Sequence, residues 1–409
     1  MKKTTTPTRS KNNCLKQICQ HIPSHLVSKL ARKHKAQSRT FSPWSHVVAM
    51  LYAHLTRAIG LNDVCDGLRL HRGWLSGIRG ATPPSRNGMS HANKKRSAKI
   101  AEELYWAVSE HLHTLSSSFG GRNYKGMPRR FKRVIHAVDS STIQLVANCM
   151  DWAKHRRRKA AAKLHLRLNL QSFLPTFAIV NTAKESDARK AWEVCAGLEA
   201  GEIVVFDKAY VDFAHLHTLE ERGVFWVSRA KEKMKFRCVK RRLKKPEGNI
   251  LRDDEILLTH SKSRRSYPTR LRRVMALVEI NAKLVEMTFI TNNMEWAASS
   301  ICDLYKSRWG IEAFFKQIKQ VLQLNAFLGH SRNAIQWQVW TALLVYLLLR
   351  YLAFLSRWNH SFTRIFTIVR SVLWSKFHLM ELLRFYGTAG GDFRLLYAPK
   401  QAFLPGFGP

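Results

Sequence analysis

Acidic side chains are scarce in this chain. Only 28 of its 409 residues are Asp or Glu, against 68 Lys and Arg, and the formal net charge is +40. No acid precedes Asp63, and basic residues recur along the whole sequence instead of forming a tail. An excess of one sign this large predicts a partner of the opposite sign. The composition therefore indicates binding to a polyanion, and nucleic acid is the obvious one.

Cysteine is sparse as well. The seven cysteines are scattered from Cys14 to Cys302, and no two of them form a Cys-x2-Cys pair. An odd, scattered set argues against both a disulfide framework and a zinc cluster. We therefore expect reduced thiols and a cytoplasmic protein.

Long apolar runs are missing too. The basic N-terminus is not followed by the apolar segment of a signal peptide. The most membrane-like stretch, Val339 to Leu349, is too short to cross a hydrocarbon core of about 30 Å. We expect a buried helix there and no membrane partner.

Two apolar segments each deliver an aspartate. Val134–Val138 predicts a strand that ends at Asp139, and Ile203–Phe206 predicts another that ends at Asp207. Ligand sites of open α/β sheets collect at the carboxyl ends of central strands, so the two aspartates are expected to be neighbours. Taken singly, each could merely cap a turn.

A third acid lies in a predicted helix from Tyr305 to Lys319. At about 100° per residue, the side chains of Tyr305, Arg308, Glu312 and Lys319 fall on one face. Glu312 is thus surrounded by groups that bind phosphate. An ordinary basic helix face, with Glu312 paired to Lys316 or Arg308, is the alternative.

The spacing Tyr-x2-Arg-x3-Glu-x6-Lys of this helix resembles the signature of a branch of bacterial insertion-sequence transposases, the fourth insertion-sequence family. Asp139 and Asp207 precede it in the order that the family requires. The resemblance implies a cut-and-paste DNA transposase with an Asp-Asp-Glu triad of Asp139, Asp207 and Glu312. It also implies an α/β, ribonuclease-H-like (retroviral-integrase-like) catalytic core.

The same three residues are the expected metal ligands. The resemblance implies two divalent ions, and hard carboxylate oxygens suit Mg²⁺, for which Mn²⁺ is an expected substitute. Arg308 and Lys319 would hold phosphates beside the scissile bond, and the Tyr305 hydroxyl would donate to a phosphate oxygen. His136 is interpreted as a core histidine rather than a ligand. Lys163 and His165 resemble a Lys-x-His feature of relatives and are expected to support the site from outside.

The expected partner is double-stranded DNA, both the terminal inverted repeats and the target. Lys316 and the run of Arg156, Arg157 and Arg158 are candidates for contacts to the DNA backbone, which give affinity without reading sequence. Synapsis of two ends implies a homodimer in the DNA complex, and the bound protein would lie on the bacterial nucleoid.

Four regions are expected along the chain. Residues 1–120 form a helical N-terminal DNA-binding module, although a generic helical bundle fits almost as well. Residues 121–230 and 290–330 form the catalytic core, 231–289 a mostly β insertion and 331–409 a helical C-terminal region. Within the first region, Ser42 is a predicted N-cap, and one long helix is expected from about Ser90 to Leu115.

The predicted insertion has no Trp between residues 227 and 295. Some relatives use a Trp of the insertion to stack on a flipped base near a DNA hairpin, so Phe236 or Tyr267 would have to take that role. A hairpin intermediate is therefore left open. Two alternative functions also remain: an inactive DNA-binding protein derived from a transposase, and a metal-dependent nuclease that does not join strands.

Overall fold

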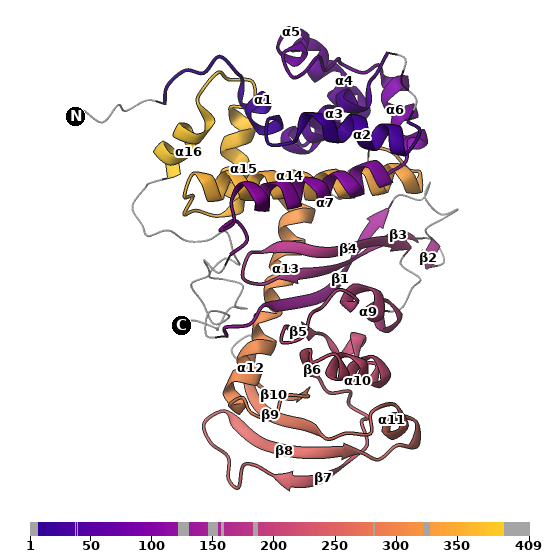
Figure 1. The fold of residues 1–409 in the computed structure, drawn as a ribbon, viewed down its shortest axis with the longest axis vertical. Helices are drawn as coiled ribbons and strands as arrows, with labels where there is room; N and C mark the ends of the chain where they lie inside the picture. Colours follow the sequence, from indigo (N-terminus) through magenta and orange to yellow (C-terminus); the bar gives the residue numbers. More distant parts are fainter. Residues whose placement is uncertain are drawn as a thin grey trace, which may run out of the picture. The chain divides into compact units, whose positions relative to one another are not determined.

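A computed structural model of the chain describes residues 7–36, 38, 40–121, 131–145, 154–156, 159–182, 187–280, 283–321 and 328–387 (Figure 1). The described residues divide into two compact units. The helical unit draws on residues 1–121, 143–162 and 315–397, and the sheet unit draws on 122–142 and 163–314. The predicted N-terminal and C-terminal regions therefore contribute to the helical unit and the predicted insertion to the sheet unit, whereas the predicted core is divided between the two.

The helical unit begins with short helices. Ser42 caps the third of them as predicted: its hydroxyl accepts a hydrogen bond from the Ser45 N–H at 3.0 Å, and Pro43 occupies the first turn. The helices in this part are α1 (Cys14–Cys19), α2 (Ser24–Lys33), α3 (Pro43–Thr56), α4 (Leu61–Leu70), α5 (Arg72–Ser76), α6 (Arg86–Lys95) and α7 (Lys99–Leu115).

The long helix expected from Ser90 to Leu115 is wrong, because the structure breaks it into α6 and α7. Arg96 lies between them in an extended conformation. Its guanidinium donates to the carbonyl oxygens of Phe41 and Ser42, the latter at 3.2 Å. A tertiary contact that satisfies two carbonyls thus outweighs the helical propensity of this stretch.

The C-terminal helices complete the unit: η4 (Gln317–Val321), α14 (Arg332–Leu355), α15 (Phe362–Ser371) and α16 (Leu379–Gly387). Helix α14 is long and apolar enough to cross a membrane by composition, but 89% of its most apolar window is buried inside the protein. It packs against α3 and α7, and Trp337 Nε1 donates to the Arg96 carbonyl at 2.7 Å. The prediction of a buried helix here is confirmed.

A mixed ten-stranded sheet forms the other part of the fold, in the order β2-β3-β1-β5-β6-β10-β9-β8-β7, with β4 paired to β3. Its strands β1, β5 and β6 are parallel, and β6 pairs antiparallel with β10. The predicted insertion therefore continues the sheet. The strands are β1 (Ile135–Leu145), β2 (Lys154–Arg156), β3 (Lys159–Asn169), β4 (Leu174–Thr182), β5 (Ile203–Phe206), β6 (Phe225–Arg229), β7 (Phe236–Arg241), β8 (Ile250–Leu258), β9 (Leu271–Ile280) and β10 (Lys283–Thr291).

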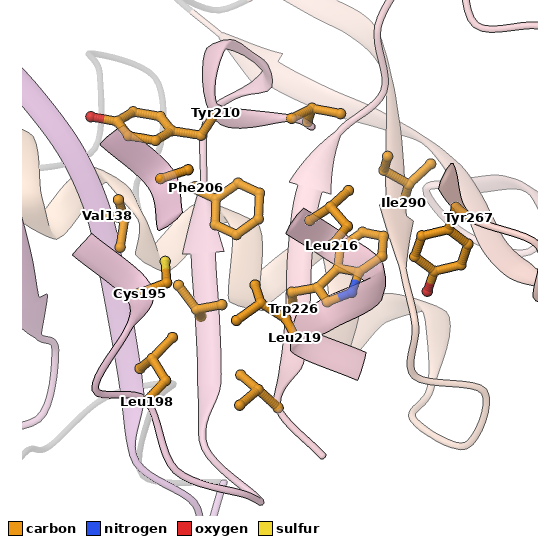
Figure 2. Close-up of a cluster of buried hydrophobic side chains, with 14 of the residues drawn as sticks. Val138, Cys195, Leu198, Phe206, Tyr210, Leu216, Leu219, Trp226, Tyr267 and Ile290 are labelled. Atoms are coloured by element: carbon orange, nitrogen blue, oxygen red, sulfur yellow. The ribbon is translucent and has the colours of Figure 1, made fainter. Parts of the chain in front are cut away.

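Helices cover both faces of this sheet. The remaining elements are α9 (Asp187–Cys195), η3 (Lys208–Tyr210), α10 (Phe213–Glu221), α11 (Ser261–Ser266), α12 (Ala298–Ser307) and α13 (Trp309–Lys316). Figure 2 shows the core on the α9 and α10 face, to which Phe206, Trp226 and Ile290 contribute. The neighbouring Phe289 contacts the Tyr305 ring of α12 at 4.9 Å. Because side chains alternate along a strand, α12 covers the opposite face.

Candidate active site

Asp139 and Asp207 occupy equivalent positions on two adjacent parallel strands. Val138 of β1 is in register with Phe206 of β5, and each aspartate is the next residue. Val138 and Phe206 both point into the α9 and α10 core, so the aspartates point to the face that α12 covers. Strand β1 does not end at Asp139, as the sequence suggested, but continues to Leu145. Only the pairing of β1 with β5 ends here, because Val138 is the last residue of β1 that pairs with β5.

Arg308 links Asp139 to Glu312. Its Nη1 donates to Asp139 Oδ2 at 3.1 Å, and its Nη2 donates to Glu312 Oε1 at 2.7 Å. Arg308 lies at the C-cap of α12, and its guanidinium also lies 5.5 Å from the centre of the Tyr305 ring. The predicted face of Tyr305, Arg308 and Glu312 is thus present, although the single predicted helix is divided into α12, α13 and the π-helical η4, which carries Lys319.

The three acids act on one another. Burial raises the pKa of Asp139 to about 6, the Arg308 charge opposes the shift, and the negative charges of Glu312 and Asp207 add to it. Asp139 is largely buried, whereas the Glu312 side chain is 54% exposed. The negative charges of Asp139 and Glu312 are compensated by one buried cation, Arg308.

Close packing fixes the helix that carries Glu312. A Cβ on Gly310 of α13 would lie 3.1 Å from Leu170 Cδ2 and 3.2 Å from Phe173 Cζ. Leu170 and Phe173 lie in the tight connection between β3 and β4, where Phe173 has a positive φ of 57°. The helix backbone passes so close to this connection that a side chain at position 310 would crowd both residues. The glycine therefore sets the position of Glu312 two residues later.

A second polar network lies on the opposite face of β1. Ser140 Oγ donates to Asp187 Oδ1 at 2.8 Å, and Lys163 Nζ lies 2.8 Å from the same oxygen. His165 Nδ1 is 3.6 Å from Asp187 and 3.3 Å from the Tyr210 hydroxyl. Ser140 also donates its backbone N–H to Asp139 Oδ1 at 2.7 Å. Asp187 thus holds the residue that follows Asp139.

Asp187 was missed by the sequence analysis. An acid at the start of a helix is a familiar pattern, favoured by the helix dipole. Nothing in the sequence indicates that this helix starts beside β1. The only local signal was the Lys-x-His pair of Lys163 and His165, which meets Asp187 here.

His136 is a core histidine, as interpreted. It is buried, and its Nε2 lies 3.2 Å from Glu202 Oε1, while Nδ1 lies 3.4 Å from Thr176 Oγ1. Burial lowers its pKa, and the contact with Glu202 opposes that shift.

The residues predicted to contact DNA differ in how far their side chains are exposed. Lys316 is exposed and Lys319 is half-buried, whereas Tyr305 and Arg308 are buried. Burial lowers the pKa of Lys319. Two buried side chains cannot meet a phosphate in this conformation, so the expectation that all four grip DNA needs correction. Arg157 and Arg158 lie outside the described residues, as does the side chain of Arg156 in β2.

The two aromatic candidates for base stacking also differ. Tyr267 is fully buried and packs edge-on against Trp226 with ring centres 6.1 Å apart. Its prediction as a stacking residue is wrong, because a buried ring cannot receive a base. Phe236 at the sheet edge is half-buried, with the Arg273 guanidinium 4.9 Å from its ring centre.

A groove of about 1130 Å³ opens in the sheet unit between the β7–β10 strands and α12. Arg272, one of its lining residues, is neutralised by a two-point ion pair with Asp253 at 2.8 and 2.7 Å. Other lining residues are basic or aromatic, and Arg242 is also paired, with Glu255 at 3.2 Å. They include Lys240, Arg241, Arg242, Lys306, Trp296 and Trp309.

The donor chemistry of the site suits a hard divalent cation. The Arg308 guanidinium contacts one carboxylate oxygen of Asp139 and one of Glu312. It supplies positive charge between two acids whose oxygens are of the kind that a hard divalent cation prefers. Within the described ranges, no three Asp, Glu, His or Cys side chains already lie in a metal-binding arrangement. A bound metal would therefore share these carboxylates with Arg308 or replace its contacts.

A cluster of acids and one arginine beside two parallel strands defines a candidate centre for metal-dependent phosphodiester chemistry. The Transposase DDE domain matches residues 130–348, more than half of the chain, and a domain of unknown function (DUF4372) matches residues 10–78. The chain belongs to the DDE transposase family. It is accordingly an enzyme of DNA transposition, that is, a DDE-type nuclease and strand transferase. Enzymes of this family generally use divalent metals.

Individual relatives agree with this family. A putative transposase, y4zB, of Sinorhizobium fredii is 30% identical over 67% of this chain and 73% of its own length. A probable transposase for insertion sequence element IS5377 of Geobacillus stearothermophilus is 26% identical over 68% of this chain and 72% of its own. A piggyBac transposase synaptic complex with hairpin DNA matches at 9% identity and a TM-score of 0.43, over 90% of this chain and 80% of that chain, too distant to inform the mechanism.

Proposed function

We propose that Asp139, Asp207 and Glu312 are the catalytic triad with which this transposase cleaves insertion-sequence ends and joins them to target DNA. The observation that carries the proposal is the shared contact of Asp139 and Glu312 with Arg308, next to the Asp207 position on β5. A largely buried acid such as Asp139 is costly for stability when other acids lie nearby, because its ionised form loses hydration. A function that needs concentrated negative charge accounts for that cost.

Two Mg²⁺ ions are the proposed cofactors, with Mn²⁺ as a substitute. Asp139 would hold both ions, and Asp207 and Glu312 would each complete one side. When bound, such ions activate the attacking oxygen and stabilise the leaving oxygen. The protein's own part is to orient the carboxylates: β1 and β5 fix the aspartates, and Gly310 and Arg308 fix Glu312.

Arg308 and Tyr305 are proposed to position the carboxylates before substrate arrives. Lys316 and Lys319 are proposed to contact phosphates, and Arg156, Arg157 and Arg158 to contact the DNA backbone. Asp187 is proposed as a positioning residue, because it holds Ser140 directly after Asp139.

We further propose that the core is ribonuclease-H-like. The strand order β4-β3-β1-β5-β6, with β1, β5 and β6 parallel, supports it. Residues 1–120 are proposed to bind the terminal repeats, with a homodimer in the synaptic complex, in the cytoplasm. A hairpin intermediate, with Phe236 near the flipped base, is the least constrained of these proposals.

One assay tests the proposal against its alternatives. Purified protein would be incubated with DNA that carries both insertion-sequence ends and a target duplex, with and without Mg²⁺. We expect excision and joining that depend on the metal. Excision without joining would assign a nuclease, and end binding without cleavage in any divalent metal would assign an inactive DNA-binding protein.

A further inference from the structure

The helical unit contains a small pocket lined mainly by aromatic rings. Its volume is about 280 Å³. Three parts of the chain build it: α3, α5 with the residue before it, and the end of α15 with the segment that follows. The lining residues, here called the aromatic pocket, are Tyr52, Thr56, His71, Trp74, Arg370, Ser371, Leu373, Trp374 and Ser375.

The rings of the aromatic pocket are arranged around His71. Its ring stacks on Trp374, with ring centres 4.4 Å apart and planes inclined by 29°, and on Trp74, with ring centres 5.8 Å apart and planes inclined by 20°. The Tyr52 ring contacts the Trp374 ring, and the two ring centres are 5.7 Å apart. Trp74 remains 46% exposed, which is unusual for so large an apolar side chain.

Close packing holds Tyr52 in this position. A Cβ on Gly67 of α4 would meet the Tyr52 hydroxyl oxygen, so the glycine leaves room for the phenol in this position. The aromatic wall is therefore packed on the side of α4 and open at Trp74. A preformed wall of this kind binds a planar ligand at little cost in ordering.

The charges around the aromatic pocket select the class of ligand. No Asp or Glu is among the described residues that line it, and Arg370 is part of the lining. Lys376 Nζ lies 5.9 Å from the centre of the Trp74 ring. The acid Asp63 acts on Tyr52 from outside, and its carboxylate already accepts from the N–H groups of Ile59 and Gly60. Cationic ligands are therefore disfavoured, whereas a planar group attached to an anion is favoured.

A nucleobase on a phosphate backbone has this chemistry. At about 280 Å³ the pocket lies just below the size range of about 300–1,000 Å³ typical of sites for drug-sized ligands, so one base is a better fit than a larger ligand. Unpaired bases stack on aromatic side chains, and basic residues beside them take the phosphates. In duplex DNA both faces of a base are covered, so the base has to come from a single-stranded stretch.

We propose that the aromatic pocket takes one base from single-stranded DNA, stacked at Trp74, with Arg370 and Lys376 beside the adjoining phosphates. The inference rests on the proposed DNA-binding role of the N-terminal region and specifies its ligand. It is independent of the triad, because it assigns no chemistry to the pocket.

The test compares two probes without any divalent metal, so that no cleavage occurs. Fluorescence anisotropy would measure the binding of the full-length protein to a short oligothymidylate and to an abasic oligomer of equal length. For the parent protein we expect the thymidylate to bind on the order of tenfold more tightly, the usual contribution of one stacked base. Trp74→Ala and Trp374→Ala should abolish most of that preference, and Trp74→Phe, which keeps a ring, should retain it.

Trp192→Ala is the matched control, because Trp192 of α9 is comparably exposed, at 45%, but lies in the sheet unit. A preference for thymidylate that survives in both Trp74→Ala and Trp374→Ala, or that is lost equally in Trp192→Ala, would overturn the proposal. Arg370→Ala should weaken both probes alike. Triad variants should keep the full preference, so a protein that fails to cleave DNA and still discriminates the two probes separates this proposal from the triad.

Discussion

Arg308 and Asp139 form a buried ion pair of 3.1 Å that joins the start of α13 to the middle of β1. The two residues come from opposite ends of the catalytic region, yet their charges meet in a place that water hardly reaches. The pair makes an acidic cluster tolerable without metal. Under the proposed function, a metal bound by Asp139 and Glu312 would compete with Arg308 for contact with these carboxylates.

The first prediction concerns the triad. Asp139→Asn, Asp207→Asn and Glu312→Gln should each reduce strand cleavage by at least about 100-fold, because misplacing the reacting groups is that costly. Binding to insertion-sequence ends should stay nearly unchanged, since it depends on many Lys and Arg contacts. Gel assays of cleavage and of end binding on one preparation measure both.

Glu232→Gln is the control for charge removal, because Glu232 is an exposed acid of the same unit that pairs with Lys208 at 2.8 Å. Its cleavage should equal that of the parent. Near-parental cleavage by any one triad variant would remove that residue from the triad.

The second prediction follows from the competition between metal and Arg308. Without metal, Arg308→Ala should lower the free energy of unfolding by about 3–5 kcal/mol, because it leaves Asp139 buried and unpaired. Mg²⁺ should then raise the melting temperature of this variant more than that of the parent, since the ion replaces the missing cation. Thermal melts with and without Mg²⁺ measure this difference.

Arg273→Ala provides the comparison, because Arg273 forms a similarly buried pair with Asp254 at 3.2 Å in the same sheet. It should be destabilised as well but should gain no extra stability from Mg²⁺. Equal gains in the two variants would show that Arg308 does not occupy the place of a metal.

Local patterns in the sequence predicted much of the sheet. Ile203–Phe206 was predicted from a short apolar run, and the mostly β insertion predicted at 231–289 contains β7, β8, β9 and most of β10. Strand β1 was predicted too short, because the polar residues after Asp139 suggested a turn. Their side chains are instead satisfied by contacts that the sequence does not reveal, such as Ser140 with Asp187.

Part of the candidate site could also be predicted from local sequence patterns, and part of it could not. Spacing within one helix predicted that Arg308 and Glu312 share a face, and their direct contact was part of the alternative interpretation as an ordinary helix face. It could not predict that Arg308 is buried against Asp139, nor that α13 passes over Leu170 and Phe173. Contacts between distant segments depend on tertiary packing. Such contacts produce no periodic pattern of residues from which they could be predicted.

The third prediction uses that close passage of α13. Gly310→Ala should destabilise the protein by about 1 kcal/mol, because crowding against Leu170 and Phe173 outweighs the gain in helix propensity. Cleavage should fall more than stability suggests, as Glu312 is displaced. Gly73→Ala, on the open surface of α5, should instead be neutral or stabilising. Urea unfolding of both variants checks the signs, and a stabilised Gly310→Ala protein would contradict the packing argument.

The fourth prediction concerns Asp187. Burial opposes its ionisation, but hydrogen bonds from Lys163 and Ser140 outweigh burial and lower its pKa. A carboxylate with a lowered folded-state pKa stabilises the protein above its unfolded pKa of about 3.9, and this contribution is lost as the pH falls through the folded value. Asp187→Asn should therefore cost about 1–3 kcal/mol at pH 7, and the two proteins should converge in acid.

Denaturant unfolding of metal-free protein at neutral and at acidic pH measures this convergence. Glu193→Gln on the same helix, whose exposed carboxylate pairs with Lys190 at 2.9 Å, should change stability little at either pH. A penalty for Asp187→Asn that is the same at both pH values would point to a loss of packing rather than a loss of charge. The asparagine variant should also cleave DNA more slowly, because Ser140 and hence Asp139 are held less firmly.

The last prediction distinguishes an exposed from a buried cation of the stretch Tyr305–Lys319, namely Lys316 from Arg308. Removing one cation that binds a DNA phosphate should lower the slope of log affinity against log salt by roughly 0.9. Lys316 is exposed, so Lys316→Ala should show that change. Arg308 is only 5% exposed and its charge is already shared by two carboxylates, so Arg308→Ala should leave the slope of metal-free end binding unchanged while abolishing cleavage. A reduced slope for Arg308→Ala would mean that the guanidinium leaves Asp139 and Glu312 to bind DNA even without metal.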